Sequence, residues 1–277
     1  MNNRVTINSR SVVPLVGLNQ TQIILQRHCN YDRNNGVLVA ESEQIQSQIS
    51  DSFLTSLVQN LTAEELNNTY FLFVASPTTS KGNFNRCIET TNIPFFQVRS
   101  VFNDLNISES HIMNLNADSH YDGIHKSKDL AEPMMFTDNS GYLEFLKQQN
   151  EGINLNFWID FEEDKYKEKR QELGAEGPDE IVGRGIHFIG VLQRYSQLFH
   201  KKHENSRLII WCGTHYDLLS PLAKQTILGY DKEDVVAVDY CGGISLLIDE
   251  NNDIVANLNG EYVPIYFPDS VQRRRHF

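Results

Sequence analysis

Two largely apolar runs, far apart in the chain, each end at a histidine. Residues 21–25 lead into Arg27 and His28, and residues 207–211 lead into Thr214 and His215. Apolar runs of this length are typical of strands that are buried on both faces of a parallel sheet. Because ligands collect beyond the carboxyl ends of such strands, we expect both histidines to lie at one site.

Other patterns along the chain favour strands alternating with helices. Residues 70–75 and 93–98 are predicted as further strands, and residues 242–258 as a hairpin. Helices are predicted around residues 45–57, from about residue 85, over 141–148, over 178–199 and from about residue 218. The charged run at 161–170 is interpreted as a solvated helix face. The expected fold is a three-layer α/β/α sandwich with a mostly parallel central sheet.

Length and composition limit the classes of protein. The 277 residues suit a single domain over 1–277, within which residues 103–180 are predicted to form a cap or insert. A formal net charge of −12 argues against nucleic-acid binding. No apolar run reaches the roughly 18 residues of a membrane span, and no secretory signal is recognised. The four cysteines lack the paired spacing of a structural zinc site, which favours free thiols and a cytoplasmic protein.

Four short segments carry residue types in a characteristic order. They are Arg27-His28-Cys29, then Ser76-Pro77 followed by Arg86 to Thr90, then Gly213-Thr214-His215, and finally residues 239–244. This order resembles the signature of the histidine phosphatase superfamily, the group that contains cofactor-dependent phosphoglycerate mutases and many phosphatases. The resemblance covers scattered segments between residue 21 and about residue 250, and it implies a phosphoglycerate mutase-like fold.

The resemblance also implies a role for each residue of these segments. His28 would attack phosphorus and form a phosphohistidine, which divides one difficult step into two easier ones. Arg27 and Arg86 would bind the phosphoryl oxygens through paired N–H donors. His215, expected to be protonated, would donate to the charge that develops on those oxygens.

An acid must protonate the leaving alcohol, and three carboxylates compete for that role. Glu132 is the first choice, and Asp104 and Glu109 remain open alternatives because they lie nearer to Arg86 in sequence. Arg33 is proposed as an extra phosphate contact. Tyr216 stands where the superfamily has a glycine, so its ring is expected to point away from phosphate or to line the leaving-group pocket.

The predicted function is therefore hydrolysis of a small phosphomonoester or phosphoanhydride, without a metal or another cofactor. A phosphomutase is one alternative. A second is a catalytically weak protein that keeps the fold as a binding or scaffold module, suggested by Cys29 and Tyr216 in place of glycines. A nucleotide-binding α/β protein is disfavoured because the sequence has neither a P-loop nor a Gly-x-Gly-x-x-Gly turn. The sequence carries no signal for an oligomeric state.

Overall fold

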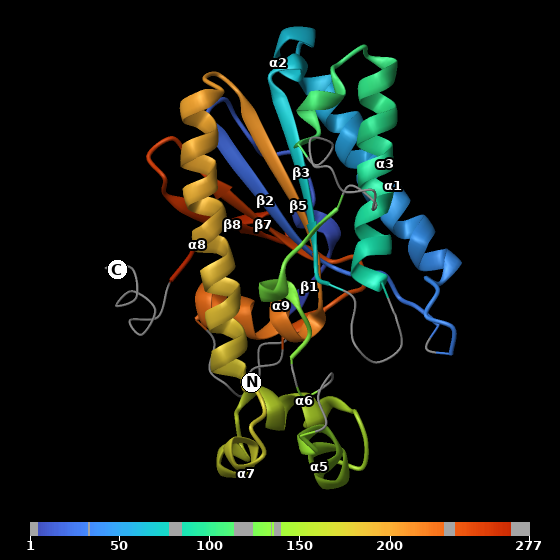
Figure 1. The fold of residues 1–277 in the computed structure, drawn as a ribbon, viewed down its shortest axis with the longest axis vertical. Helices are drawn as coiled ribbons and strands as arrows, with labels where there is room; N and C mark the ends of the chain where they lie inside the picture. Colours follow the sequence, from blue (N-terminus) through green and yellow to red (C-terminus); the bar gives the residue numbers. More distant parts are fainter. Residues whose placement is uncertain are drawn as a thin grey trace.

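A computed structural model describes residues 5–32, 34–77, 85–113, 124–133, 135, 140–229 and 236–266 (Figure 1). Within these residues, the main sheet has seven strands in the order β4-β3-β5-β2-β7-β8-β9. Its strands are β2 (Gln20–Arg27), β3 (Thr69–Ala75), β4 (His125–Lys126), β5 (Arg207–Thr214), β7 (Gly243–Ile248), β8 (Ile254–Leu258) and β9 (Glu261–Pro264). A second, two-stranded sheet pairs β1 (Val5–Ile7) with β6 (Val236–Val238) in parallel.

The main sheet is mixed, so the expectation of a mostly parallel sheet is wrong. Strands β4, β3, β5 and β2 pair in parallel. Strands β7, β8 and β9 pair antiparallel with one another, and β7 is antiparallel to β2. The physical reason is the short connection between β7 and β8, because strands joined by a tight hairpin must run in opposite directions. The hairpin predicted over residues 242–258 is thus confirmed, and it extends the central sheet.

Helices lie on both sides of the main sheet (Figure 1). The helices of four or more residues are α1 (Ala40–Asn60), α2 (Ala63–Asn67), α3 (Arg86–Asp104), α5 (Tyr142–Gln149), α6 (Leu155–Glu162), α7 (Lys167–Glu172), α8 (Pro178–Lys202), α9 (Tyr216–Ala223) and the π-helical turn η5 (Lys224–Leu228). Single turns occur at η1 (Ser9–Ser11), η2 (Glu109–His111) and η4 (Lys128–Leu130).

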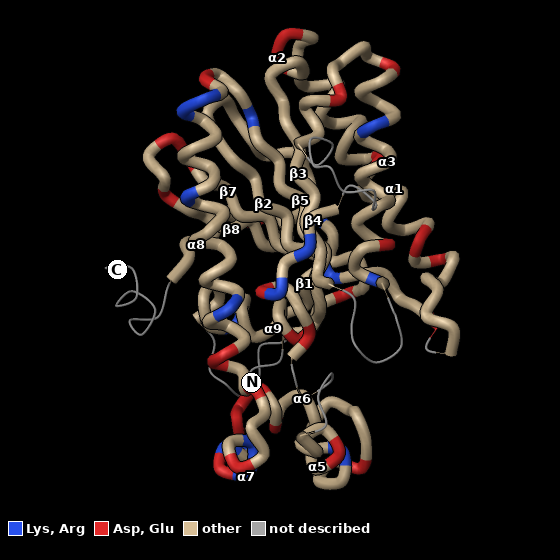
Figure 2. The backbone as a smooth tube through the Cα atoms, in the orientation of Figure 1, with Lys and Arg blue, Asp and Glu red and all other residues tan. Residues whose placement is uncertain are grey.

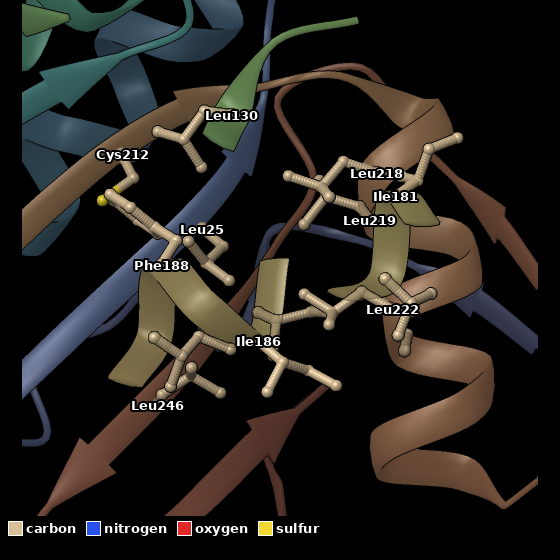
Figure 3. Close-up of a cluster of buried hydrophobic side chains, with 14 of the residues drawn as sticks. Leu25, Leu130, Ile181, Ile186, Phe188, Cys212, Leu218, Leu219, Leu222 and Leu246 are labelled. Carbon is tan, nitrogen blue, oxygen red and sulfur yellow. The ribbon is translucent and has the colours of Figure 1, made fainter. Parts of the chain in front are cut away.

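The side chains of the strands belong to two separate apolar clusters, one on each face of the sheet. Successive residues of a strand point to opposite faces, so they alternate between the two clusters. Ile24 of β2 packs with Phe53 of α1 and Phe95 of α3. Its neighbours Ile23 and Leu25 belong to the other cluster, which contains α8 and α9. Figure 3 shows part of this second cluster, in which residues of α8 and α9 gather around Leu25, Cys212 and Leu130. The sheet is therefore buried on both faces around its parallel strands.

The segment 93–98, predicted as a strand, lies inside helix α3. Its apolar run does not by itself distinguish the two structures. The buried positions Thr91, Pro94, Phe95, Val98 and Phe102 follow the spacing of one helix face. Pro94 is therefore accommodated within the helix, although proline removes one helical hydrogen bond.

The charged run at 161–170 is more buried than a solvated helix face. Figure 2 shows acidic and basic residues close together on α7, but Arg170 is only 3% exposed. Its guanidinium forms a two-bond pair with the carboxylate of Asp164, at 2.7 and 2.8 Å. Gly177 allows this arrangement, because a Cβ at that position would lie 2.3 Å from the Arg170 Cζ.

Helices α5, α6 and α7 lie together at one end of the molecule, beyond α9 (Figure 1). Helix α9 begins directly after β5, so this group lies on the side where the parallel strands of the sheet end. Among the residues described, no helix is both long and apolar enough to cross a membrane.

Candidate active site

His28 and His215 lie side by side because their strands are neighbours in register. Strands β2 and β5 are parallel, and Arg27 is paired with Thr214, so the next residue of each strand is a histidine at the same edge. The backbone N–H of His28 donates to the carbonyl of Thr214 at 2.9 Å. The two imidazole centroids are 5.2 Å apart, and the rings are inclined at 66°. The central prediction from the sequence, that both histidines lie at one site, agrees with this geometry.

Arg86 is the first residue of α3, and a glycine brings that helix against the sheet. A Cβ on Gly213 would lie 2.3 Å from the Thr91 Oγ1 and 2.8 Å from the Cys87 carbonyl oxygen, so a larger residue in β5 would push α3 away. With α3 in place, the Arg86 Nη2 lies 3.4 Å from the His215 Nδ1. Thr90, one turn further along α3, accepts a hydrogen bond from the backbone N–H of Cys29 at 2.9 Å.

The hydrogen bond of His28 determines which of its nitrogens is free. The Nδ1 lies 2.6 Å from the carbonyl oxygen of Cys29, and a carbonyl can only accept, so Nδ1 carries the hydrogen. Burial, together with the charge of Arg86, lowers the pKa of His28 well below its ordinary value. The ring is therefore neutral at pH 7, and its Nε2 has a free lone pair.

His215 is also neutral in this arrangement, whereas the sequence predicts a protonated ring during the reaction. Burial, the neighbouring His28 and the guanidinium of Arg86 lower its pKa well below the ordinary value. Arg86 can only donate, which assigns the lone pair to Nδ1 and the hydrogen to Nε2. That Nε2 lies 2.9 Å from the hydroxyl oxygen of Ser76, to which it donates. Ser76 belongs to the Ser76-Pro77 segment of the motif, and its contact with His215 is evident only in the structure.

Arg27 lies between two tyrosine rings. Its Cζ is 3.9 Å from the ring centroid of Tyr240 and 5.4 Å from that of Tyr216, and one Nη donates to the carbonyl of Val238. Burial lowers the pKa of Arg27. The Nε atoms of Arg27 and Arg86 are both buried and have no hydrogen-bond partner among the described residues. Buried donors without acceptors are costly, and an anionic ligand would satisfy them.

Of the three candidate acids, only Glu132 is brought to the histidines. Its carboxylate pairs with Arg86, and its Oε1 lies 3.7 Å from the His215 Nδ1. Asp104 is the last residue of α3, roughly 27 Å along the helix axis from Arg86 at 1.5 Å per residue. Glu109 pairs with Arg99, and both of those side chains are exposed. The position of Glu132 therefore favours it over the two alternatives.

The remaining residues singled out in the sequence have different surroundings. Tyr216 begins α9, its hydroxyl donates to the Val236 carbonyl at 3.2 Å, and its ring contacts Trp158 of α6. Its ring also lies beside the guanidinium of Arg27. Cys29 fits where a glycine was expected, because its Sγ lies 3.2 Å from that of Cys241 in a fully buried contact. Arg33 lies outside the described residues.

Three residues near the histidines were not predicted. The rings of Tyr31 and Tyr240 lie 5.8 and 5.9 Å from that of His28, and Arg86 lies over Tyr31 at 4.6 Å. Asp217 is 7% exposed, and its Oδ2 is buried without a partner in the described structure. Burial raises the pKa of Asp217 to about 6. Their closeness in sequence to His28, His215 and Cys241 was the available signal for all three.

The site combines two neutral imidazoles, a carboxylate, and two guanidinium groups whose buried Nε atoms have no partner among the described residues. Such a set suits a small anion, which would supply the acceptors that the guanidinium groups lack. Among the described residues, no group of three or more His, Cys, Asp and Glu side chains is placed to hold a metal ion.

Comparison with known proteins gives similarity in structure only. No protein-family model and no curated protein sequence matches this chain. A phosphoglycerate mutase from Bacillus anthracis str. Sterne is 13% identical, with a TM-score of 0.48, over 88% of this chain and 95% of that one. A putative alpha-ribazole-5'-P phosphatase from Escherichia coli str. K-12 substr. MG1655 is 14% identical, with a TM-score of 0.40, over 90% and 99%.

The third structure is a mycobacterial glucosyl-3-phosphoglycerate phosphatase, 12% identical with a TM-score of 0.42, over 86% of this chain and 96% of that one. By name, the three similar structures are thus a phosphoglycerate mutase and two phosphatases, one of them putative.

Proposed function

We propose that this protein is a phosphatase that hydrolyses a small phosphomonoester or phosphoanhydride through a phosphohistidine on His28. One observation carries the proposal: a neutral His28, with its Nε2 lone pair free, lies 5.2 Å from a second neutral imidazole beside Arg86. A phosphate dianion repels an anionic nucleophile. A neutral imidazole avoids this repulsion, because it brings no negative charge to phosphorus. Two guanidinium groups with unused donors offset the charge of that dianion.

The first step forms a bond between the His28 Nε2 and phosphorus while the bond from phosphorus to the leaving oxygen breaks. Arg27 and Arg86 would hold the phosphoryl oxygens, whose spread of charge is stabilised by fixed donors. His215, neutral before binding, would take up a proton beside the dianion and become a further donor. This shift is expected because a nearby negative charge raises the pKa of a histidine.

Glu132 would supply the proton that the leaving alcohol needs. Its carboxylate pairs with Arg86, so a phosphate that binds to Arg86 competes with it. Once released, the carboxylate would take up a proton from solvent and donate that proton to the leaving oxygen. In the second step the ionised carboxylate accepts a proton from water, which attacks phosphorus, and the bond to His28 breaks to release inorganic phosphate. Both steps balance in protons, because the one given to the alcohol is recovered from water.

The wider architecture agrees with this proposal. Helices on both faces of the sheet suggest the three-layer arrangement. Within the predicted cap over residues 103–180, we propose that α5, α6 and α7 cover the site, since they lie beyond the ends of the parallel strands (Figure 1). Asp104 lies at the far end of α3 and does not belong to this cover. Arg33 as an additional phosphate contact stays a prediction.

The test is hydrolysis of p-nitrophenyl phosphate between pH 5 and 7 by wild type, His28→Ala and a control. His125→Ala is the matched control, because His125 is exposed on the edge strand β4. We expect His28→Ala to lose more than about 1,000-fold in kcat/KM, as removal of a nucleophile does, and the control to keep wild-type activity. Wild type treated with a radiolabelled phosphoester should carry an acid-labile label that His28→Ala lacks.

A binding or scaffold protein is the second candidate, and two observations favour it. Arg86 is already paired with Glu132, and the bulky Tyr216 stands beside Arg27. If wild type turns over no member of a broad phosphoester panel and shows no labelled phosphohistidine, the scaffold is correct. Net transfer of phosphate from one position to another of a substrate, without release, would indicate a mutase.

A further inference from the structure

A single side chain of α8 holds the loop that presents Glu132. The guanidinium of Arg184 donates from one nitrogen to the carbonyls of Lys128 and Asp129, at 3.0 and 3.1 Å. Both of its terminal nitrogens reach the carbonyl of Ala131, at 3.3 and 3.2 Å. Ala131 is the residue directly before Glu132, so these bonds fix the backbone from which the carboxylate projects.

The other edge of the same guanidinium is fixed by a second pair of bonds. The Arg184 Nε and one Nη donate to the two carboxylate oxygens of Glu176, at 2.6 and 3.0 Å. Glu176 lies between α7 and α8, and its side chain is only 11% exposed. A planar group that is bonded along two edges cannot rotate without losing hydrogen bonds, so its direction toward the loop is set.

The loop is also fastened at the residue before Ala131. The hydroxyl of Thr214 donates to the carbonyl of Leu130 at 3.0 Å, and the Leu130 side chain is fully buried in the same cluster as Leu25 and Cys212 (Figure 3). Thr214 precedes His215 in the chain. One end of this support therefore lies on the strand that carries His215, and the other lies on α8.

We propose that Arg184 is a positioning residue, which holds the Glu132 carboxylate at the distance from Arg86 and His215 that proton transfer to the leaving group requires. The inference rests on the proposed function and adds to it a residue outside the phosphate-binding set. A displacement of a proton donor by a fraction of an ångström is enough to slow its transfer, because the donor must be within hydrogen-bond reach.

The test uses the dependence on the leaving group, which a merely structural role would not change. Protonation by an acid matters most for an alkyl phosphate, whose alkoxide leaves poorly, and least for p-nitrophenyl phosphate. Arg184→Lys keeps the charge but loses the planar fork. We expect its kcat/KM to fall about 10- to 100-fold for an alkyl phosphate and less than about 3-fold for p-nitrophenyl phosphate, within the range of general acid catalysis.

Two further variants make the result specific. Arg194→Lys, an exposed arginine on the same helix, should leave both substrates unaffected. In a Glu132→Gln background the effect of Arg184→Lys on the alkyl phosphate should disappear, because a positioning residue acts only through the group that it positions. If Arg184→Lys does not fold, Glu176→Gln is used in its place. That variant weakens the hydrogen bonds that fix the Arg184 guanidinium.

Equal losses for both substrates, or losses that add in the double variant, would overturn the role of Arg184. That outcome differs from failure of the proposed function, in which wild type hydrolyses neither substrate or His28→Ala remains active. In that second case the inference about Arg184 fails together with its premise.

Discussion

Arg170 and Arg86 are both buried, yet their guanidinium groups have opposite surroundings. Arg170 donates to both oxygens of Asp164, to the carbonyl of Ala175 and to Glu180. Arg86 has a carboxylate and an imidazole beside it, but its Nε has no partner in the part of the chain that the structure describes. Asp164 raises the pKa of Arg170, whereas burial lowers that of Arg27, the neighbour of Arg86 in the site.

The number of matched donors distinguishes the two arginines: Arg170 has a structural role, and Arg86 is available to a ligand. A buried charge whose donors are all matched contributes to folding, because removing it leaves its partners unpaired. A buried guanidinium with unused donors costs folding free energy, and an anion would recover that cost. Substitution of Arg170 should therefore reduce mainly stability, and substitution of Arg86 should reduce mainly activity.

The largest expected effect is on the stability of Arg170→Met. The substitution leaves the Asp164 carboxylate, itself buried, without its partner, so the free energy of unfolding should fall by about 3–5 kcal/mol. Urea unfolding followed by circular dichroism measures this. Lys169→Met is the matched control and should change stability by less than about 0.5 kcal/mol. Equal stability of the two variants would show that the Arg170 cluster is not structural.

Arg86→Met should affect activity more than stability. We expect kcat/KM for p-nitrophenyl phosphate to fall about 100- to 1,000-fold, the effect of losing one donor to a developing oxyanion. The loss in unfolding free energy should remain below that of Arg170→Met, since the Arg86 Nε has no partner among the described residues. Arg99→Met, on the exposed side of α3, serves as the control. A large loss of stability with little loss of activity would contradict the comparison.

The third prediction concerns the carboxylate beside this site. Burial raises the pKa of Asp217 from 3.8 to about 6, so the folded protein binds the proton more tightly than the unfolded chain does. The contribution of Asp217 to the free energy of unfolding should therefore be fully present below about pH 4 and be lost as pH rises to about 6, a change of about 3 kcal/mol for this shift.

Asp217→Asn should remove that part of the pH dependence and gain stability relative to wild type above pH 6. Urea unfolding at several pH values between 4 and 7.5 measures it. Glu168→Gln, which replaces an exposed carboxylate of α7, should keep the wild-type fall. The same profile in wild type and Asp217→Asn would mean that Asp217 is ionised at pH 4 in the folded protein.

Local sequence was sufficient for the elements that carry the histidines. The apolar runs before His28 and His215 predict buried strands, and both strands form with the histidines just beyond their ends. Where the local pattern was ambiguous, prediction failed. The apolar run at 93–98 suits a strand or a helix equally, and only packing against α1 and the sheet made it part of α3.

The sequence by itself determined which residues stand at the strand ends, because alternation and apolar runs depend on near neighbours in the chain. The tertiary structure decided which distant groups join them. Glu132 reaches Arg86 from 46 positions away (132 − 86), and Arg184 reaches Ala131, the residue before Glu132, from 53 positions away. Such contacts depend on how helices dock on the sheet, and no short-range pattern encodes that docking.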